Sequence, residues 1–366
     1  MARVERIALK HLNQFDADRA LLNLKNGMFN IDTLQLLPHD PKLYPSIRQL
    51  PISYDQSKEC KKINDFFNDV LEAKDVDLIA ELFGFLLTKN YKIHKAFMFY
   101  GSGRNGKGTM LRLVEAFMGV ENVSHVSLEQ LANNRFAASK IVGKLVNING
   151  DIPQRDLSST ETFKQLTGED IVQMEAKYSQ PFDYLNQAKM IFAANKLPRS
   201  PDDTSGFYSR WLIVLFKSKF TKPNPKLDEE LSEPDELSGL LNFALKGLKR
   251  LKENEYQFSY DLSEKEVRLI YLRYSDPAIA FLMDCCESYD GYIAKNELYK
   301  SFKEYVKKNN LPILSAKMFS SHIQQQNYLP IETIHQNVNN ERAWVWSGIR
   351  LKKSEKQISQ EVGATA

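Results

Sequence analysis

The residues with the clearest chemical meaning lie in FMFYGSGRNGKGTMLRLVEAFMG, at 97–119. An apolar run leads into a glycine-rich turn, and a second apolar run with helical spacing follows. Gly101, Gly106 and Lys107 fit the spacing G-x-x-x-x-G-K, which binds phosphate groups where it joins a strand to a helix. Glycines let backbone N–H groups approach phosphates, and the helix start adds a favourable dipole. The residues expected to contact a nucleotide are Gly101, Ser102, Gly103, Arg104, Asn105, Gly106, Lys107, Gly108, Thr109 and Met110.

Lys107 is expected to neutralise charge on the β- and γ-phosphates of ATP. The next residue is Gly108, where such loops normally carry a serine or threonine that binds magnesium. Thr109 follows one position later, so we expect its hydroxyl to reach magnesium or a water molecule bound to it. The ending G-K-G-T also resembles P-loop nucleotide kinases, and a nucleotide kinase is therefore an alternative function.

Three polar residues adjoin later apolar runs. Asp151 ends GKLVNINGD, Asn195 ends AKMIFAAN, and Arg210 directly precedes WLIVLF. A carboxylate at Asp151 would hold magnesium and polarise the attacking water, while the Asn195 amide can hydrogen-bond both the γ-phosphate and that water. The Arg210 guanidinium suits an arginine finger supplied to a neighbouring subunit's ATP. Gly150, not a second acid, precedes Asp151. The sequence leaves open whether Asp151 alone both holds magnesium and polarises the attacking water.

An α/β layer must position these residues. From about 96 to 220, apolar strands alternate with helices, which predicts an α/β fold with a mainly parallel sheet. Between Asp151 and Asn195, the stretch TGEDIVQMEAKYSQPFDY alternates through Val172 and Met174, turns, and returns through Phe182, which predicts a hairpin.

Composition sets the broad class. The chain has 366 residues, 43% of them apolar, and a net charge of +3 that is too small to imply nucleic acid by itself. Cys60, Cys285 and Cys286 lack metal-ligand spacing, and no run of 18 apolar residues or signal peptide is present. We expect a soluble, cytoplasmic protein without membrane contact.

Five stretches in this order resemble the successive motifs of superfamily 3 helicases: GSGRNGKGT, KLVNINGDI, FKQLTGEDIVQMEAKYSQPFDY, KMIFAANKLPR and GFYSRW. They are most similar to the branch found in primase-helicases of poxviruses, phage satellites and archaeal plasmids. LNLKNGMFNIDTLQLLPHD resembles the region before the ATPase in that branch. The stretch that begins DPAIAFLMDCCES resembles its winged-helix end.

The resemblance implies an AAA+-like P-loop ATPase fold. It assigns Lys107 and Thr109 to Walker A, Asp151 to Walker B, Asn195 to sensor 1 and Arg210 to the arginine finger. Magnesium would be held by Thr109 and Asp151.

The resemblance also implies a hexameric ring that translocates 3′-to-5′ on single-stranded DNA and unwinds a forked duplex, with a fused or separate primase. In such rings the hairpin grips DNA, so Lys177 is the expected phosphate contact and Tyr178 lies near a base or sugar. A solvated surface lysine is the alternative at Lys177. A ring ATPase that binds or loads at origin DNA without unwinding is the alternative function.

The expected domains follow from these assignments. They are a mostly helical pre-ATPase region at 1–92, the ATPase core at 93–225, a helical connection at 226–275, a winged-helix-like domain at 276–352 and a disordered tail at 353–366.

Overall fold

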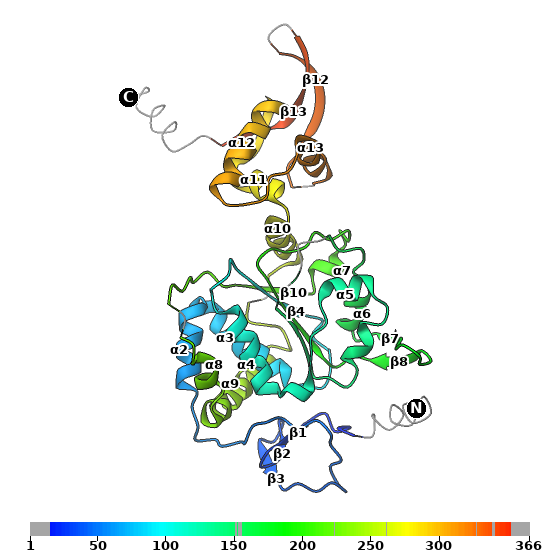
Figure 1. Cartoon of the computed structure of the whole chain (residues 1–366), viewed down its shortest axis with the longest axis vertical. Coiled ribbons are helices and arrows are strands. Elements are labelled where there is room, and N and C mark those ends of the chain that lie inside the picture. Colours follow the sequence, from blue (N-terminus) through cyan, green and yellow to red (C-terminus); the bar gives the residue numbers. More distant parts are fainter. Residues whose placement is uncertain are drawn as a thin grey trace. The chain divides into compact units, whose positions relative to one another are not determined.

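The computed structural model describes residues 15–150, 152, 156–222, 224–260, 262–326, 328–338 and 341–352. The chain forms two compact units, Met1–Val267 and Arg268–Ala366 (Figure 1). Asp151 and the tail expected at 353–366 lie outside the described residues.

The first described elements are three short strands, and the helices of the N-terminal region follow from Lys61 onward. Three short strands form an antiparallel sheet in this order: β1 (Leu21–Leu24), β2 (Gly27–Asn30) and β3 (Gln35–Leu37). A Cβ at Gly27 would lie 2.4 Å from the Leu37 carbonyl oxygen, so the close pairing of these strands needs glycine. Two apolar runs around Lys-Asn-Gly are the sequence signal for the hairpin of β1 and β2. Within 15–92, α-helix begins only at Lys61.

A layer of helices follows: α2 (Lys61–Val70), α3 (Ala73–Leu86), α8 (Leu227–Leu231) and α9 (Pro234–Glu253). Helices α3 and α9 cross closely because glycines lie at the contact. A Cβ at Gly84 would lie 2.4 Å from the Leu248 nitrogen, and one at Gly247 would lie 1.9 Å from the Ala80 carbonyl oxygen. The segment expected as a helical connection at 226–275 therefore contributes α9 to the packing of the first unit.

The centre of the first unit is a parallel sheet of five strands in the order β10-β4-β9-β6-β5. Its strands are β4 (Ala96–Tyr100), β5 (Val123–Ser124), β6 (Val146–Asn149), β9 (Lys189–Ala194) and β10 (Trp211–Leu215). All six residues of β9 are buried, as expected for a strand covered on both faces. The predicted α/β fold with a parallel sheet is thus confirmed, and the carboxyl ends of the strands share one edge of it.

Helices and short turns connect these strands. They are α4 (Lys107–Met118), α5 (Leu128–Asn133), α6 (Glu161–Leu166), α7 (Ser205–Tyr208) and the 3₁₀ turns η1 (Val120–Asn122) and η2 (Ala138–Ile141). The α4 helix follows β4 after a turn of six residues, 101–106.

The predicted hairpin between Asp151 and Asn195 is confirmed. Strands β7 (Ile171–Met174) and β8 (Phe182–Leu185) pair antiparallel, with Met174 opposite Phe182 (Figure 1). The Gly143 N–H donates to the Tyr184 hydroxyl at 3.0 Å, which ties the base of the hairpin to the rest of the unit.

The second unit has its own aromatic core. After α10 (Glu264–Ser275), in which the unit boundary falls, come α11 (Pro277–Cys285), β11 (Cys286–Ala294), α12 (Lys295–Lys308), α13 (Ala316–Gln325), β12 (Glu332–Val338) and β13 (Glu341–Leu351). The strands form an antiparallel sheet in the order β11-β13-β12. Phe281, Phe302, Phe319 and Trp346 are buried together.

The cysteines belong to the packing of the chain. Cys60, Cys285 and Cys286 are free thiols. Burial raises the pKa of Cys60 to about 11 and that of Cys286 to about 12, so these two thiols stay protonated and unreactive at neutral pH. In the part of the chain that the structure describes, no helix has both the length and the apolar character needed to cross a membrane.

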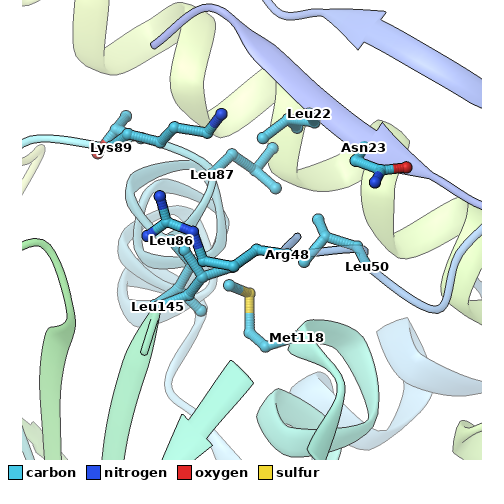
Figure 2. A pocket seen from close by; sticks show the side chains of 10 residues that line it. Leu22, Asn23, Arg48, Leu50, Leu86, Leu87, Lys89, Met118 and Leu145 are labelled. Carbon is cyan, nitrogen blue, oxygen red and sulfur yellow. The ribbon is translucent and has the colours of Figure 1, made fainter. Parts of the chain in front are cut away.

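A small cavity of about 10 Å³ lies between the N-terminal sheet and the helical layer (Figure 2). Arg48 and Lys89 line it, and both contact the Asp16 carboxylate, at 3.1 Å and 3.8 Å. This volume is about that of one water molecule. No residue that the sequence predicts for the functional site lines this cavity, which is too small for a nucleotide.

Candidate nucleotide-binding site

The loop between β4 and α4 follows a path that requires glycine. Gly103 and Gly106 have φ angles of +81° and +91°, in the left-handed region that glycine favours. At Gly101 a Cβ would lie 2.4 Å from the Phe216 carbonyl oxygen and 2.1 Å from Asn105 Nδ2. The loop therefore turns tightly and passes close to the end of β10, with its backbone unobstructed by side chains at these positions.

Lys107 lies at the start of α4 and its side chain is held by uncharged oxygens. Its Nζ donates to the Gly101 carbonyl oxygen at 2.6 Å, to Asn105 Oδ1 at 3.0 Å and to Asn195 Oδ1 at 3.0 Å. The residue is only 6% exposed, and this burial lowers the pKa of Lys107 to about 8. Among the described residues no carboxylate pairs with it, so within that part of the chain the buried ammonium is held by uncharged oxygens alone.

Backbone N–H groups add to this positive site. Met110 donates its N–H to the Gly106 carbonyl oxygen, the first bond of the helix. The N–H groups of Lys107, Gly108 and Thr109 precede it and have no acceptor within α4. Helix starts with open N–H groups bind anions, so loop and helix together can accept phosphate.

The remaining residues of the loop differ in exposure. Ser102 and Arg104 are exposed, and the Arg104 carbonyl oxygen accepts from the Phe220 N–H at 3.0 Å. The Met110 side chain is fully buried in the core and cannot contact a nucleotide in this position. Its backbone N–H already donates to the Gly106 carbonyl oxygen within the helix.

Thr109 makes a contact that the sequence did not indicate. Its Oγ1 accepts a hydrogen bond from Arg112 Nη2 at 3.2 Å, and Arg112 Nε donates to Asp228 Oδ2 at 2.7 Å. Arg112 lies three residues after Thr109, so helical spacing could have identified it as a neighbour. Asp228 is on α8, more than a hundred positions away, and no local signal connects it to the loop.

The structure brings Asn195 to Lys107 because β9 lies beside β4. Strand β6 lies on the other side of β9, and its last residue, Asn149, has a buried Oδ1 that no described residue hydrogen-bonds. Asp151 follows two positions later, outside the described residues. In the described part of the chain, no group of three or more His, Cys, Asp or Glu residues could hold a metal ion.

Arg210 lies at the opposite edge of the sheet. Its carbonyl oxygen accepts from the Ala96 N–H at the first residue of β4, whereas Lys107 follows the carboxyl end of that strand. Five residues at about 3.3 Å each separate the two levels by roughly 15 Å. The Arg210 Nη1 donates to the Gly206 carbonyl oxygen, and its buried Nε has no acceptor among the described residues. Burial also lowers the pKa of Arg210.

The hairpin β7–β8 carries the two residues predicted to contact DNA. Lys177 and Tyr178 are exposed in the turn, and Tyr178 is the most exposed large hydrophobic side chain of the described residues, with a φ of +64°. Beside this turn, Arg135 Nε lies 3.4 Å from the Glu175 carboxylate. Among the ion pairs of the described residues, none involves Lys177.

Two family models match separate segments of the chain. Residues 2–72 match the family described as D5 N terminal like, and residues 99–210 match a family of unknown function, DUF5906. The second segment runs from β4 to Arg210 and so contains the whole loop, Asn195 and the hairpin. Domains of these two kinds are found in primase-helicase type proteins of phages and viruses.

No curated protein matches the chain. Among solved structures, the A-form apo structure of the NrS-1 C-terminal region has a TM-score of 0.46 at 11% identity, covering 91% of this chain and 83% of that one. A second A-form structure of this region, spanning 305–718, has a TM-score of 0.43 at 12% identity and covers 81% and 77%. An apo structure of the same region has a TM-score of 0.43 at 11% identity and covers 91% and 83%.

Proposed function

We propose that this chain is the ATP-hydrolysing motor of a DNA replication protein, a helicase of the superfamily 3 type with an AAA+-like P-loop core. The observation that carries the proposal is Lys107, a buried lysine at a helix start whose acceptors among the described residues are all uncharged. The matches to domains found in phage and viral primase-helicases support a role in replication.

The residues around the loop fit a nucleoside triphosphate. The N–H groups of Lys107, Gly108 and Thr109 suit phosphate oxygens, and the Lys107 ammonium supplies the charge that a γ-phosphate needs. When bound, ATP supplies a phosphoryl group for transfer to water. Asn195 would give up its bond to Lys107 and orient that water, because its amide lies at the end of the neighbouring strand.

Magnesium fits less well. The Thr109 hydroxyl bonds the Arg112 guanidinium, and a cation beside a metal ligand repels a divalent ion. Asp151, the second expected magnesium ligand, lies outside the described residues.

Arg210 acts on a different subunit in this proposal. It lies roughly a strand length away from Lys107 in its own chain, so it serves a site across a subunit interface in a hexameric ring. The hairpin with Lys177 and Tyr178 then faces the channel and contacts single-stranded DNA. Motion of the hairpin on hydrolysis drives translocation 3′-to-5′, and a primase domain, fused or separate, acts on the same DNA.

The second unit supplies contacts to duplex DNA in this proposal. Its order of elements, α11-β11-α12-α13-β12-β13, is helix, strand, two helices and a two-stranded wing, as in winged-helix domains. In such domains the third helix, here α13, enters the major groove.

The test is ATP hydrolysis by a Lys107→Ala variant. Loss of the buried Lys107 cation removes stabilisation of the transferring phosphoryl group, so turnover should fall about 100-fold or more. Lys249→Ala on α9, which removes a 76%-exposed lysine, is the matched control and should keep normal turnover. Near-normal hydrolysis by a folded Lys107→Ala protein would show that the loop is not the catalytic site.

A further inference from the structure

Gly108 is the residue that departs from the usual P-loop pattern, and the structure shows what lies beside it. A Cβ at Gly108 would come 3.1 Å from Arg112 Nη1. Arg112 therefore lies over the glycine at the exposed side of the first turn of α4, where a serine or threonine would otherwise project. The glycine makes room for this guanidinium.

Two contacts hold Arg112 in that place. Its Nε bonds Asp228 Oδ2 and its Nη2 bonds Thr109 Oγ1. Nη1 has no acceptor among the described residues and is the atom closest to Gly108. The second oxygen of Asp228 is likewise unbonded in the described part of the chain, so the ion pair is a single contact that leaves donors of the guanidinium free.

We propose that Arg112 is a further nucleotide-binding residue, whose guanidinium binds a phosphate oxygen at the start of α4 in place of the metal-binding hydroxyl that P-loops carry after the lysine. This inference rests on the proposed function, because it places Arg112 in the same nucleotide site. Arg112 supplies charge-assisted hydrogen bonds from the side of the helix, and Lys107 supplies them from within the loop. Asp228 balances the charge of Arg112 while the site is free of phosphate.

The arrangement also accounts for Thr109. With its hydroxyl bonded to Arg112, Thr109 orients the guanidinium and is a positioning residue. Phosphate charge on this side of the site is then neutralised by the protein itself, so part of the nucleotide affinity is independent of magnesium.

Equilibrium binding of a fluorescent ATP analogue, measured in magnesium and in EDTA, tests the proposal. Arg112→Ala should weaken binding about tenfold in both buffers, the effect of losing a hydrogen bond to a charged group. Arg112→Lys should recover only part of the loss because lysine keeps the charge but not the planar fork. Arg350→Ala, which breaks an exposed arginine–glutamate pair with Glu287 in the second unit, is the control and should bind like the wild type.

Gly108→Ser is the second variant, and its added Cβ and hydroxyl compete for the place of Nη1. It should lose affinity in EDTA and regain it in magnesium, since a serine hydroxyl there restores the usual metal ligand. Wild-type affinity for Arg112→Ala, alongside lost binding for Lys107→Ala, would overturn the role of Arg112 and leave the proposed function standing. Failure of the wild-type protein to bind the analogue would overturn both.

Discussion

Lys107 is the residue on which the account depends, and its surroundings make its charge conditional. Burial lowers the pKa of Lys107 to about 8, and all three of its acceptors are uncharged. The charged form of Lys107 is therefore less stable in the free protein than in water, and an anion bound beside it stabilises that form. This arrangement differs from that of a surface lysine, whose charge water stabilises.

We predict from this pKa that nucleotide affinity depends on pH. Below about pH 7, Lys107 is charged before the nucleotide arrives, so affinity is constant. Above about pH 8, the free protein must take up a proton to bind phosphate, and affinity should fall by up to about tenfold per pH unit. Titrations of the ATP analogue between about pH 7 and pH 10 measure this. An affinity that stays flat across the range would contradict the buried, uncompensated lysine.

The backbone course of the loop could be predicted because its residues are contiguous in sequence. G-x-x-x-x-G-K between a strand and a helix specifies its own backbone course, since Gly103 and Gly106 adopt left-handed φ angles. The contacts of Arg112 with Thr109 and Asp228 could not be predicted in the same way. They depend on how α8 packs near α4, which is a tertiary property that no local pattern encodes.

At the scale of elements, the hairpin β7–β8 has the proposed role of contacting DNA, apart from the nucleotide chemistry proposed for the loop between β4 and α4. Its two strands were predictable from alternation, and Val172 and Met174 are buried as that pattern requires. The N-terminal sheet was not predicted, because its strands have only three or four residues and such short runs give little alternation. The turn at Lys-Asn-Gly was the signal that should have decided it.

Lys177→Ala should weaken binding of single-stranded DNA and leave basal ATP hydrolysis unchanged. Removal of one phosphate contact lowers the dependence of log affinity on log salt by about one unit or less. Binding of labelled single strands at several salt concentrations measures the slope, and Lys249→Ala on α9 is the matched control. If the slope and affinity match the wild type, Lys177 is a solvated surface residue. If basal hydrolysis is lost, Lys177 belongs to the nucleotide site or to a subunit contact.

At the scale of the whole molecule, we propose that Arg210 serves the nucleotide site of a neighbouring subunit, because in its own chain it lies at the opposite end of β4 from Lys107. Arg210→Ala chains should bind ATP but fail to hydrolyse it, because the finger that faces each site is missing. Mixed with Lys107→Ala chains, they should regain part of the activity, since some interfaces then combine an intact loop with an intact Arg210. Hydrolysis rates across a series of mixing ratios measure the recovery. No recovery in mixtures that still assemble would place the role of Arg210 within its own chain.

The central claim is that ATP hydrolysis at Lys107 drives separation of DNA strands. The most direct measurement is release of a labelled strand from a forked duplex by the wild-type protein, with and without ATP, beside Lys107→Ala. The account predicts release by the wild type only when ATP is present, and none by Lys107→Ala. Binding of the fork with ATP hydrolysis but without strand release would contradict the helicase function and favour an ATPase that loads on DNA. Phosphorylation of a nucleotide acceptor would contradict it too and favour a kinase.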